Sequence, residues 1–318
     1  MHFLVTGGGG FIGSNLVEEL LKSGQTVRVL DNFSTGKREN LRPFISDFEL
    51  IEGDIRSYHV TDRAVRGTEI ILHQAALPSV PRSINDPITS NEVNVVGTLN
   101  ILEAARSHGV RRIVYASSSS VYGDNPMLPK VETMTPKPLS PYAVSKLAGE
   151  HYCRIFSELY GIETVALRYF NVFGPRQDPN SQYSAVIPRF INAMLNGTSP
   201  MIYGDGEQSR DFTYVSNVVR ANMLAATEAD AVGKAMNCAT HGQITLNDLV
   251  DNLNGILETD IKAQYADTRP GDIKHSYADI HLLQSATGYS PITDFASGLH
   301  KTVRYYREQP NMPASFTS

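Results

Sequence analysis

Tyr142 and Lys146 stand four residues apart in the segment Ser140-Pro-Tyr-Ala-Val-Ser-Lys146, and together they could move a proton. A free tyrosine titrates near pH ~10, so alone it is a poor base at neutral pH. In a helix the lysine lies on the same face, where its ammonium favours the phenolate. Such a pair could accept the proton of a hydroxyl during its oxidation to a carbonyl. An ordinary helix with an exposed Tyr and Lys has the same spacing, so the interpretation needs support from elsewhere.

A glycine-rich turn near the N-terminus gives the first support. In Thr6-Gly-Gly-Gly-Gly-Phe-Ile-Gly13, Gly8, Gly10 and Gly13 satisfy G-x-G-x-x-G, and Gly7 with the last two satisfies G-x-x-G-x-x-G. Glycine lets the backbone turn tightly and approach a pyrophosphate, while the N-terminus of the following helix offers N–H groups to phosphates. A glycine turn without a ligand is the alternative. The strand–turn–helix context favours a dinucleotide site.

Asp31 ends the second predicted strand, eighteen residues after Gly13. A carboxylate there can accept hydrogen bonds from both adenosine ribose hydroxyls and would repel a 2′-phosphate, which predicts NAD rather than NADP. Lys37 and Arg38 lie close by and weaken this preference, and a simple turn residue is the alternative for Asp31. Asp54, after the third predicted strand, stands where the edge of an adenine could be met.

Four serines follow a predicted buried strand in Ala116-Ser-Ser-Ser-Ser-Val-Tyr-Gly123. Ligands of open α/β sheets bind beyond the carboxyl ends of the strands, so these hydroxyls are expected near a nicotinamide and its substrate. A polar loop that hydrogen-bonds to itself explains any single serine equally well.

Short apolar runs alternate with helical patterns through the first half of the chain, which predicts a parallel sheet covered by helices on both faces. Beyond about residue 171 the pattern becomes irregular. Helices are expected at about 12–22, 93–107, 142–160, 185–195 and 246–257. The predicted strands are Phe3–Val5, Val27–Leu30, Phe48–Ile51, Ile70–Leu72, Ile113–Tyr115 and Thr164–Leu167.

The predicted fold is therefore an α/β fold, a Rossmann-type doubly wound parallel sheet with a smaller α/β substrate domain on its C-terminal side. The dinucleotide-binding domain is expected over residues 1–170, with a segment returning to it at about 215–240. The substrate domain is expected over 171–214 and 241–308, and 309–318 is expected to be a loose tail.

The composition excludes several classes of function. The chain has 318 residues and a net charge of −5, which gives no reason to expect nucleic acid as a partner. No apolar run is long enough to cross a bilayer, and the N-terminus enters a strand-like stretch without a signal peptide, so a cytoplasmic protein is expected. Cys153 and Cys238 form no metal-ligand spacing, so no metal is expected, and both are interpreted as buried thiols.

Taken together, the glycine turn, Asp31, the serine cluster before Val121-Tyr-Gly123 and the Tyr142–Lys146 pair resemble the extended short-chain dehydrogenase/reductase family, nucleotide-sugar epimerase branch, from about residue 2 to 305. The resemblance implies NAD that is tightly bound and not consumed. It implies Ser118 as the catalytic hydroxyl, Tyr142 as the base, and Lys146 as the residue that tunes Tyr142 and holds the nicotinamide ribose. The expected cofactor contacts are Gly7, Gly10, Phe11, Ile12, Gly13, Asp31, Asn32, Ser34, Thr35, Gly36, Asp54, Ile55, Gln74, Ala75, Ala76, Tyr142 and Lys146.

The same resemblance implies a UDP-sugar substrate. Asn171 matches the asparagine that contacts substrate phosphates, and Arg210 and Arg269 match two pyrophosphate-binding arginines, whose guanidinium groups suit phosphate oxygens. The expected substrate contacts are Ser79, Arg82, Ser118, Ser119, Ser120, Asn171, Val186, Ile187, Tyr203, Arg210, Arg269, Asp272 and Ser276.

Branches of this family differ in the residues just before Val-Tyr-Gly. Dehydratases carry an Asp-Glu pair there because elimination of water needs an extra acid and base, and the decarboxylating branch carries a glutamate. Here the positions hold Ser119 and Ser120. The resemblance thus implies an isomerase that oxidises and re-reduces one carbon, in a 4-epimerisation of a UDP-hexose through a transient 4-keto intermediate.

Ser276 matches a position that gates sugar size, and a small residue there leaves room for a 2-acetamido group. The chain thus resembles the UDP-N-acetylglucosamine 4-epimerases, which implies preference for UDP-GlcNAc and UDP-GalNAc with activity on UDP-Glc and UDP-Gal. Open alternatives are a UDP-glucuronate 4-epimerase, a dehydrogenase that releases NADH, and a non-catalytic NAD-binding sensor.

The resemblance also implies a homodimer, formed through a four-helix bundle of the helices at about 93–107 and 142–160. Tyr152, Ile155, Phe156 and Leu159 make an apolar stripe on the second helix, and this stripe could equally face the sheet.

Overall fold

A seven-stranded parallel sheet forms the larger part of the molecule in the computed structural model, which describes residues 1–179, 185–268 and 274–308. The strand order is β11-β6-β5-β4-β1-β2-β3. The strands are β1 (His2–Thr6), β2 (Thr26–Asp31), β3 (Glu49–Glu52), β4 (Ile70–His73), β5 (Arg112–Ser118), β6 (Glu163–Tyr169) and β11 (Ala235–Cys238). The predicted α/β fold with a doubly wound parallel sheet is confirmed.

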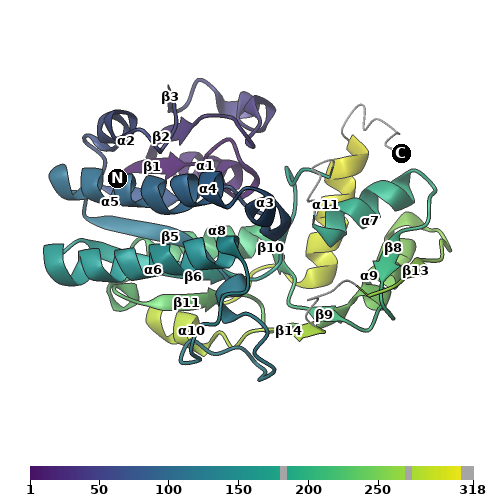
Figure 1. Cartoon of the computed structure of the whole chain (residues 1–318). Helices are drawn as coiled ribbons and strands as arrows, with labels where there is room; N and C mark the ends of the chain where they lie inside the picture. The colour runs from purple at the N-terminus through teal and green to yellow at the C-terminus, as the bar shows by residue number, and fades with distance from the viewer. Residues whose placement is uncertain (180–184, 269–273, 309–318) are drawn as a thin grey trace.

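Both faces of this sheet are covered, which explains why its strands are continuous apolar runs. Along β1, Phe3 and Val5 belong to one buried cluster and Leu4 to another on the opposite face. Helices α2, α5 and α6 supply side chains to the cluster that contains Leu4, and α1, α8 and α10 supply the other. Figure 1 shows α5 and α6 in front of the sheet. The bounds are α1 (Phe11–Lys22), α2 (Tyr58–Val65), α5 (Gly97–Ser107), α6 (Pro141–Tyr160), α8 (Val215–Ala225) and α10 (His281–Thr287).

A second group of elements lies beside the sheet, on the right in Figure 1. Its helices α7, α9 and α11 contact one another, and the predicted helices at 185–195 and 246–257 are confirmed as α7 and α9. The bounds are α7 (Val186–Leu195), α9 (Leu246–Leu257), α11 (Phe295–Glu308), β7 (Val172–Phe173), β8 (Met201–Tyr203), β9 (Ser209–Arg210), β10 (Thr213–Tyr214), β12 (Ile244–Thr245), β13 (Gln264–Ala266) and β14 (His275–Ser276).

The chain passes between the two groups more than once. Helix α8 packs on α1 and β6, β11 pairs with β6, and α10 contacts β11. Helix α10 thus lies with the main sheet, although its residues fall in the 241–308 range expected for the substrate domain. The division into two domains stays a prediction, and the tail at 309–318 lies outside the described residues.

The predicted helix at 93–107 has a more complex start. Helix α4 (Pro87–Asn91) runs through a π-helical turn, η3 (Glu92–Val96), into α5. Within that turn the buried Asn94 accepts a hydrogen bond from the Leu77 backbone at 2.7 Å and donates to Ser145 of α6 at 3.0 Å. Other short helices are α3 (Val80–Asn85), η1 (Arg38–Asn40), η2 (Arg42–Phe44), η4 (Ser119–Tyr122) and η5 (Ala229–Ala231).

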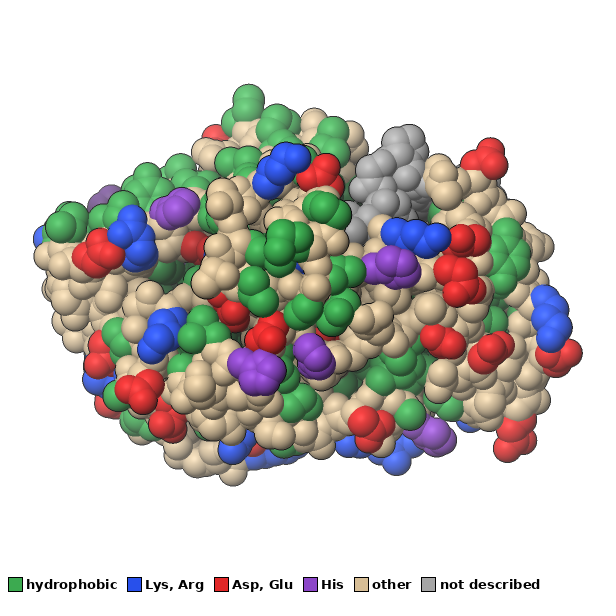
Figure 2. Space-filling view, turned by 90° about the horizontal axis from the view of Figure 1, so that it is seen from below, with side chains coloured by type: hydrophobic (Ala, Val, Ile, Leu, Met, Phe, Trp, Pro, Cys, Tyr) green, Lys and Arg blue, Asp and Glu red, His purple; other side chains and the backbone are tan. Residues whose placement is uncertain are grey.

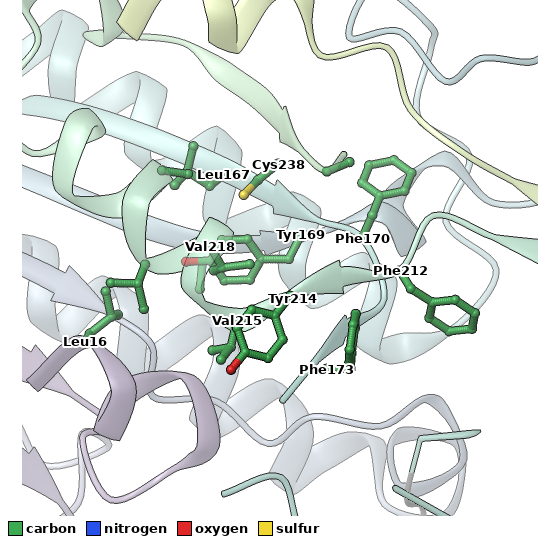
Figure 3. Packing of buried hydrophobic residues seen from close by; sticks show 14 of the residues in the cluster. Leu16, Leu167, Tyr169, Phe170, Phe173, Phe212, Tyr214, Val215, Val218 and Cys238 are labelled. Carbon is green, nitrogen blue, oxygen red and sulfur yellow. The ribbon is translucent and has the colours of Figure 1, made fainter. Parts of the chain in front are cut away.

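One apolar cluster extends from the sheet into the second group of elements. Figure 3 shows it running from Leu16 of α1, past Val215 and Val218 of α8, to Phe173 and Phe212. The rings of Phe173 and Phe212 lie edge to face with centroids 6.3 Å apart, a favoured arrangement for aromatic pairs. The two groups of elements therefore share a core.

Candidate active site

Helix α6 begins immediately before Tyr142. Ser140 caps the helix by accepting a hydrogen bond from the Ala143 N–H at 3.1 Å, and Pro141 occupies the first turn, where its missing N–H costs nothing. The Tyr142 N–H donates to Ser83 Oγ of α3 at 3.0 Å. These contacts fix the backbone that carries the predicted base.

Ser118, the last residue of β5, acts on the Tyr142 phenol. Burial raises the pKa of Tyr142 above its ordinary value, and the polar interaction with Ser118 offsets part of this by lowering it. Ser118 Oγ also accepts from the Ser120 N–H at 3.2 Å, so its own O–H can still donate. The two predicted catalytic hydroxyls are thus brought together.

Lys146 is anchored to β5, the strand that ends at Ser118. Its ammonium donates to the Ala116 carbonyl at 2.8 Å and lies 6.0 Å from the Tyr142 ring centroid. Burial lowers the pKa of Lys146 to about 8. The ammonium thus lies near the Tyr142 ring while a strand carbonyl accepts its hydrogen bond. That Lys146 tunes Tyr142 and holds the nicotinamide ribose stays a prediction.

The glycine turn forms a cradle that side chains would fill. A Cβ added at Gly13 would stand 2.1 Å from the Gly7 carbonyl oxygen. Gly7 has a φ of +69°, and a Cβ there would stand 2.7 Å from the Ala75 nitrogen. Helix α1 begins directly after Gly10, with Phe11 and Ile12 in its first turn. This shape, with N–H groups at a helix start, fits the pyrophosphate of a dinucleotide.

Asp31 is buried at the end of β2 under this turn. Its carboxylate accepts from the Gly9 N–H at 2.8 Å and from the Phe33 N–H at 2.7 Å. Burial raises the pKa of Asp31, and these backbone bonds lower it. Each carboxylate oxygen keeps a second lone pair, so Asp31 can still accept a ribose hydroxyl.

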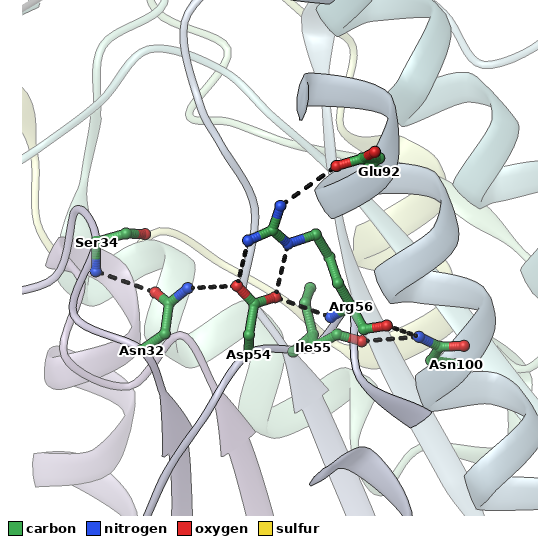
Figure 4. A network of polar contacts seen from close by, with 7 residues as sticks. All are labelled: Asn32, Ser34, Asp54, Ile55, Arg56, Glu92 and Asn100. Atoms are coloured by element: carbon green, nitrogen blue, oxygen red, sulfur yellow. Dashed lines mark hydrogen bonds and ion pairs between the residues drawn. The ribbon is translucent and has the colours of Figure 1, made fainter. Parts of the chain in front are cut away.

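The loop after β2 is tied to the end of β3. Asn32 donates to Asp54 at 2.9 Å, and its own oxygen accepts from the Ser34 N–H, as Figure 4 shows. Arg56 contacts the same Asp54 carboxylate at 2.8 Å and lowers its pKa. Ile55 follows Asp54, while Thr35 and Gly36 continue the loop, whose Lys37 N–H donates to the Gly9 carbonyl. The predicted adenosine-side residues are thus gathered around one network.

The segment after β4 lies beside the glycine turn. Gln74 donates to the Tyr169 hydroxyl at 3.1 Å, and the Ala75 N–H, next to Ala76, donates to Thr6 Oγ1 at 3.2 Å. His73 was assigned no role from the sequence; its buried ring hydrogen-bonds Thr6 at 2.7 Å and Thr98 at 3.0 Å. Burial lowers the pKa of His73 to about 3, so its ring is neutral.

A cavity of about 280 Å³ lies in the second group of elements. It is lined by five predicted substrate residues, namely Asn171, Val186, Ile187, Tyr203 and Arg210. Asn171 has a φ of +34° and donates to the Asp211 carbonyl at 3.3 Å. Further lining residues are Val172, Phe173, Ala185, Arg189, Phe190, Met201, Gln208, Phe212 and Leu246.

Arg210 and Ser276 are neighbours in a small sheet, since β9 and β14 pair with these two residues in register. Arg210 donates to the Lys274 carbonyl at 3.2 Å. Ser79 has a φ of +101° and caps α3, the helix that carries Arg82. Ser119 and Ser120 are half-buried beside Ser118. Arg269 and Asp272 lie outside the described residues.

The sequence analysis missed two polar residues that lie at or beside this cavity. Asp211 is fully buried and accepts from the Thr240 N–H at 3.0 Å and the Ala278 N–H at 3.3 Å, so it ties β9 to two other segments. Gln208 lines the cavity and donates to the Tyr203 carbonyl at 2.6 Å. Both lie within two residues of Arg210 in Gln208-Ser-Arg-Asp211, and this closeness to a predicted phosphate-binding arginine was the available signal.

The described residues also bear on metal binding, on membrane spanning, on the two cysteines and on surface charge. In residues 1–179, 185–268 and 274–308, no three His, Cys, Asp or Glu side chains gather as a metal site, and no helix has the length and apolar character needed to cross a membrane. Both cysteines are buried, as predicted. Figure 2 shows Lys and Arg scattered among Asp and Glu over the face that it draws.

Three known proteins illustrate what this chain is similar to. A structure of a UDP-N-acetylglucosamine 4-epimerase from Methanobrevibacter ruminantium M1, in complex with UDP-N-acetylmuramic acid, is 43% identical, with a TM-score of 0.93 over 97% of this chain and 99% of that one. A UDP-glucose 4-epimerase of Mycolicibacterium smegmatis is 38% identical over 97% of this chain and 99% of its own length. A structure of a UDP-glucuronic acid 4-epimerase from Bacillus cereus, with UDP-glucuronic acid and NAD, is 33% identical, with a TM-score of 0.89 over 97% and 99%.

A family model described as the NAD dependent epimerase/dehydratase family matches residues 3–239, which include the glycine turn, the serine cluster and the Tyr142–Lys146 pair. The nucleotide-sugar epimerase resemblance drawn from the sequence is confirmed. This chain belongs to the NAD dependent epimerase/dehydratase family.

Proposed function

We propose that this protein catalyses the NAD-dependent 4-epimerisation of a UDP-hexose through a transient 4-keto intermediate. The observation that carries the proposal is the gathering of Tyr142, Ser118 and Lys146 where α6 meets the end of β5. It lies at the carboxyl edge of a parallel sheet, which is where such folds bind their ligands. The three similar proteins described above are named as nucleotide-sugar 4-epimerases, which supports the same activity.

In the proposed reaction Tyr142 takes the proton of the sugar 4-hydroxyl, and Ser118 shares the hydrogen bond during the transfer. NAD, when bound, supplies the hydride acceptor and returns the hydride, so the cofactor is not consumed. Lys146 holds its ammonium within the same buried region through the Ala116 carbonyl, where it can bind a ribose hydroxyl. The cradle of Gly7 and Gly13 would hold the pyrophosphate, and Asp31 the adenosine ribose.

Epimerisation fits better than elimination because of the groups around Ser118. The segment from Ser117 to Gly123 holds hydroxyls and no carboxylate. Elimination of water or loss of CO₂ needs an additional acid or base beside the reacting carbon. Oxidation followed by reduction at the same carbon would need, besides NAD as the hydride carrier, only the proton carried by Tyr142.

We further propose that acetylated sugars are preferred. Ser276 pairs with Arg210, so a sugar whose diphosphate is held by Arg210 would extend past a small side chain. A serine there leaves room for a 2-acetamido group. UDP-GlcNAc and UDP-GalNAc are therefore the expected substrates, with slower turnover of UDP-Glc and UDP-Gal.

The test is proton NMR of the purified protein incubated separately with UDP-GlcNAc, UDP-Glc and UDP-glucuronate. The expected result is a 4-epimer of each hexose, formed fastest from UDP-GlcNAc, without accumulation of NADH. Turnover of UDP-glucuronate alone would replace the proposal by the glucuronate alternative, and NADH rising with substrate loss would indicate a net dehydrogenase.

The variant Tyr142→Phe tests the role of the phenol itself. Because general acid–base groups contribute about 10²- to 10⁴-fold, turnover should fall by at least about 100-fold, while UDP still binds. Full activity in this variant would contradict the assigned chemistry. Absence of both turnover and UDP binding in the wild-type protein would instead favour the NAD sensor.

A further inference from the structure

Helix α6 is joined to the end of β5 through three consecutive strand residues. Ala116 accepts from Lys146 at 2.8 Å, Ser117 donates to Glu150 at 2.5 Å, and Ser118 acts on the Tyr142 phenol. Tyr142, Lys146 and Glu150 recur every four residues, so they lie along one face of the helix. Two of these contacts involve the predicted catalytic residues, and the middle one, Ser117–Glu150, has no assigned role.

Glu150 is held in turn by Arg168 of β6. The guanidinium donates from Nε at 2.9 Å and from Nη2 at 2.7 Å to the two carboxylate oxygens, and both side chains are 6% exposed. The remaining Nη1 donates to the Tyr122 hydroxyl at 2.9 Å, which donates to Asn237 of β11 at 2.6 Å. A buried polar network therefore runs from the serine cluster across three strands.

Stability alone does not explain a buried ion pair of this kind. Removing two charges from water costs about as much as their attraction returns, and an apolar pair of similar size is often equally stable. The pair does provide a fixed geometry, because a bidentate guanidinium–carboxylate contact sets the orientation of both groups. The oxygen that faces Ser117 is fixed by this contact.

We propose that Ser117, Glu150 and Arg168 are positioning residues that hold the Ser118 hydroxyl in reach of the Tyr142 phenol. The inference rests on the proposed function of Tyr142. Ser117 precedes Ser118 in the strand, so its bond to Glu150 sets how far the strand end stands from α6. A displacement of about 1 Å at a reacting centre can cost about 100-fold in rate.

The first experiment removes only the link to the strand. In Ser117→Ala the ion pair stays intact, and kcat for the best UDP-hexose should fall about 10-fold or more, with KM changed less than about twofold. Thr164→Val is the matched control, because Thr164 is also buried and its hydroxyl also bonds α6, at Cys153, 2.8 Å away and near the start of β6. Equal kcat losses in the two variants, or none in Ser117→Ala, would overturn the proposal.

The second experiment separates positioning from folding. The single variant Glu150→Met leaves Arg168 charged and buried without its partner, so its thermal midpoint should fall. The double variant with Arg168→Met should recover the midpoint but not kcat. Recovery of both would mean that the pair is merely structural. A wild-type protein that turns over no UDP-sugar would refute the proposed function instead, whereas normal turnover in Ser117→Ala refutes only the positioning.

Discussion

Ser118, the last residue of β5, acts on the phenol of Tyr142, which lies in the first turn of α6. Burial raises the pKa of Tyr142 and the interaction with Ser118 lowers it, so Ser118 favours loss of the phenol proton. In the proposed reaction the base is the phenolate, whose fraction increases with pH.

Ser118→Ala should therefore shift the pH dependence of kcat/KM to higher pH. Loss of an interaction that favours the phenolate raises the pKa of Tyr142, so the variant needs a more alkaline solution for the same phenolate fraction. The measurement is kcat/KM between about pH 6 and 10. A profile that falls in amplitude without moving along the pH axis would contradict this role.

The buried His73 should make the free energy of unfolding depend on pH. Its pKa is lowered from the ordinary 6.5 to about 3, chiefly by burial, so its stabilising contribution is present above about pH 6.5 and is lost as the pH falls toward 3. Between pH 6.5 and 4.5 the loss should be about 2 to 3 kcal/mol in the free energy of unfolding. Urea titrations of wild type and His73→Gln should show a flatter acid dependence in the variant. Parallel curves would exclude His73 as the cause.

Gly13→Ala should abolish retention of NAD. The added Cβ would stand 2.1 Å from the Gly7 carbonyl oxygen, so the turn must move. Its N–H groups would then no longer point at the pyrophosphate. Gly255→Ala is the control, because a Cβ at that helical position meets nothing within 4 Å. The measurement is the amount of NAD that heating releases from each purified protein. An unchanged content in Gly13→Ala would contradict the cradle.

Ser276→Tyr should separate the substrates. A phenol ring beside Arg210 would occupy the space proposed for the 2-acetamido group, so kcat/KM for UDP-GlcNAc should fall about 10-fold or more. Turnover of UDP-Glc should survive, and Ser276→Ala should leave both substrates unchanged. If both activities fall together in Ser276→Tyr, Ser276 does not gate sugar size.

The proposed homodimer predicts the effect of a charge on α6. Phe156 of the predicted stripe packs toward the sheet, whereas Leu159 is 69% exposed, and Ile88 on the adjacent α4 is 72% exposed. Leu159→Glu should shift the protein toward monomer in sedimentation or light scattering. Ile292→Glu, a change at a residue that is 62% exposed, should leave the mass unchanged. A monomeric wild-type protein would refute the dimer.

The main sheet could be predicted because its strands are buried on both faces and read as apolar runs. The sequence predicts only that the segment at about 215–240 returns to the first domain, and it does not predict strand β11 within it. The reason is that Asn237 breaks the apolar pattern of this strand. Tertiary bonds decide this case: Asn237 donates to the Lys130 carbonyl at 2.9 Å and the Asp279 carbonyl at 3.0 Å. Such partners, far away in sequence, leave no local signal.

The site shows the same limit. The spacing of Tyr142 and Lys146 correctly places both on one face of α6, but it cannot reveal that the Ala116 carbonyl takes the ammonium. Glu150 and Arg168 are eighteen residues apart on different elements, so in the sequence each reads as a solvated surface charge. Their burial depends on how α6 lies across the sheet.

The return of α8 and β11 to the main sheet has a consequence for engineering. A truncation after residue 170 would strip the sheet of its edge strand and expose the apolar face that α8 covers. Sugar specificity therefore cannot be transferred between relatives by exchanging one contiguous segment of the chain. It would require grafting at least two separate insertions, with the intervening helix and strand kept from the recipient.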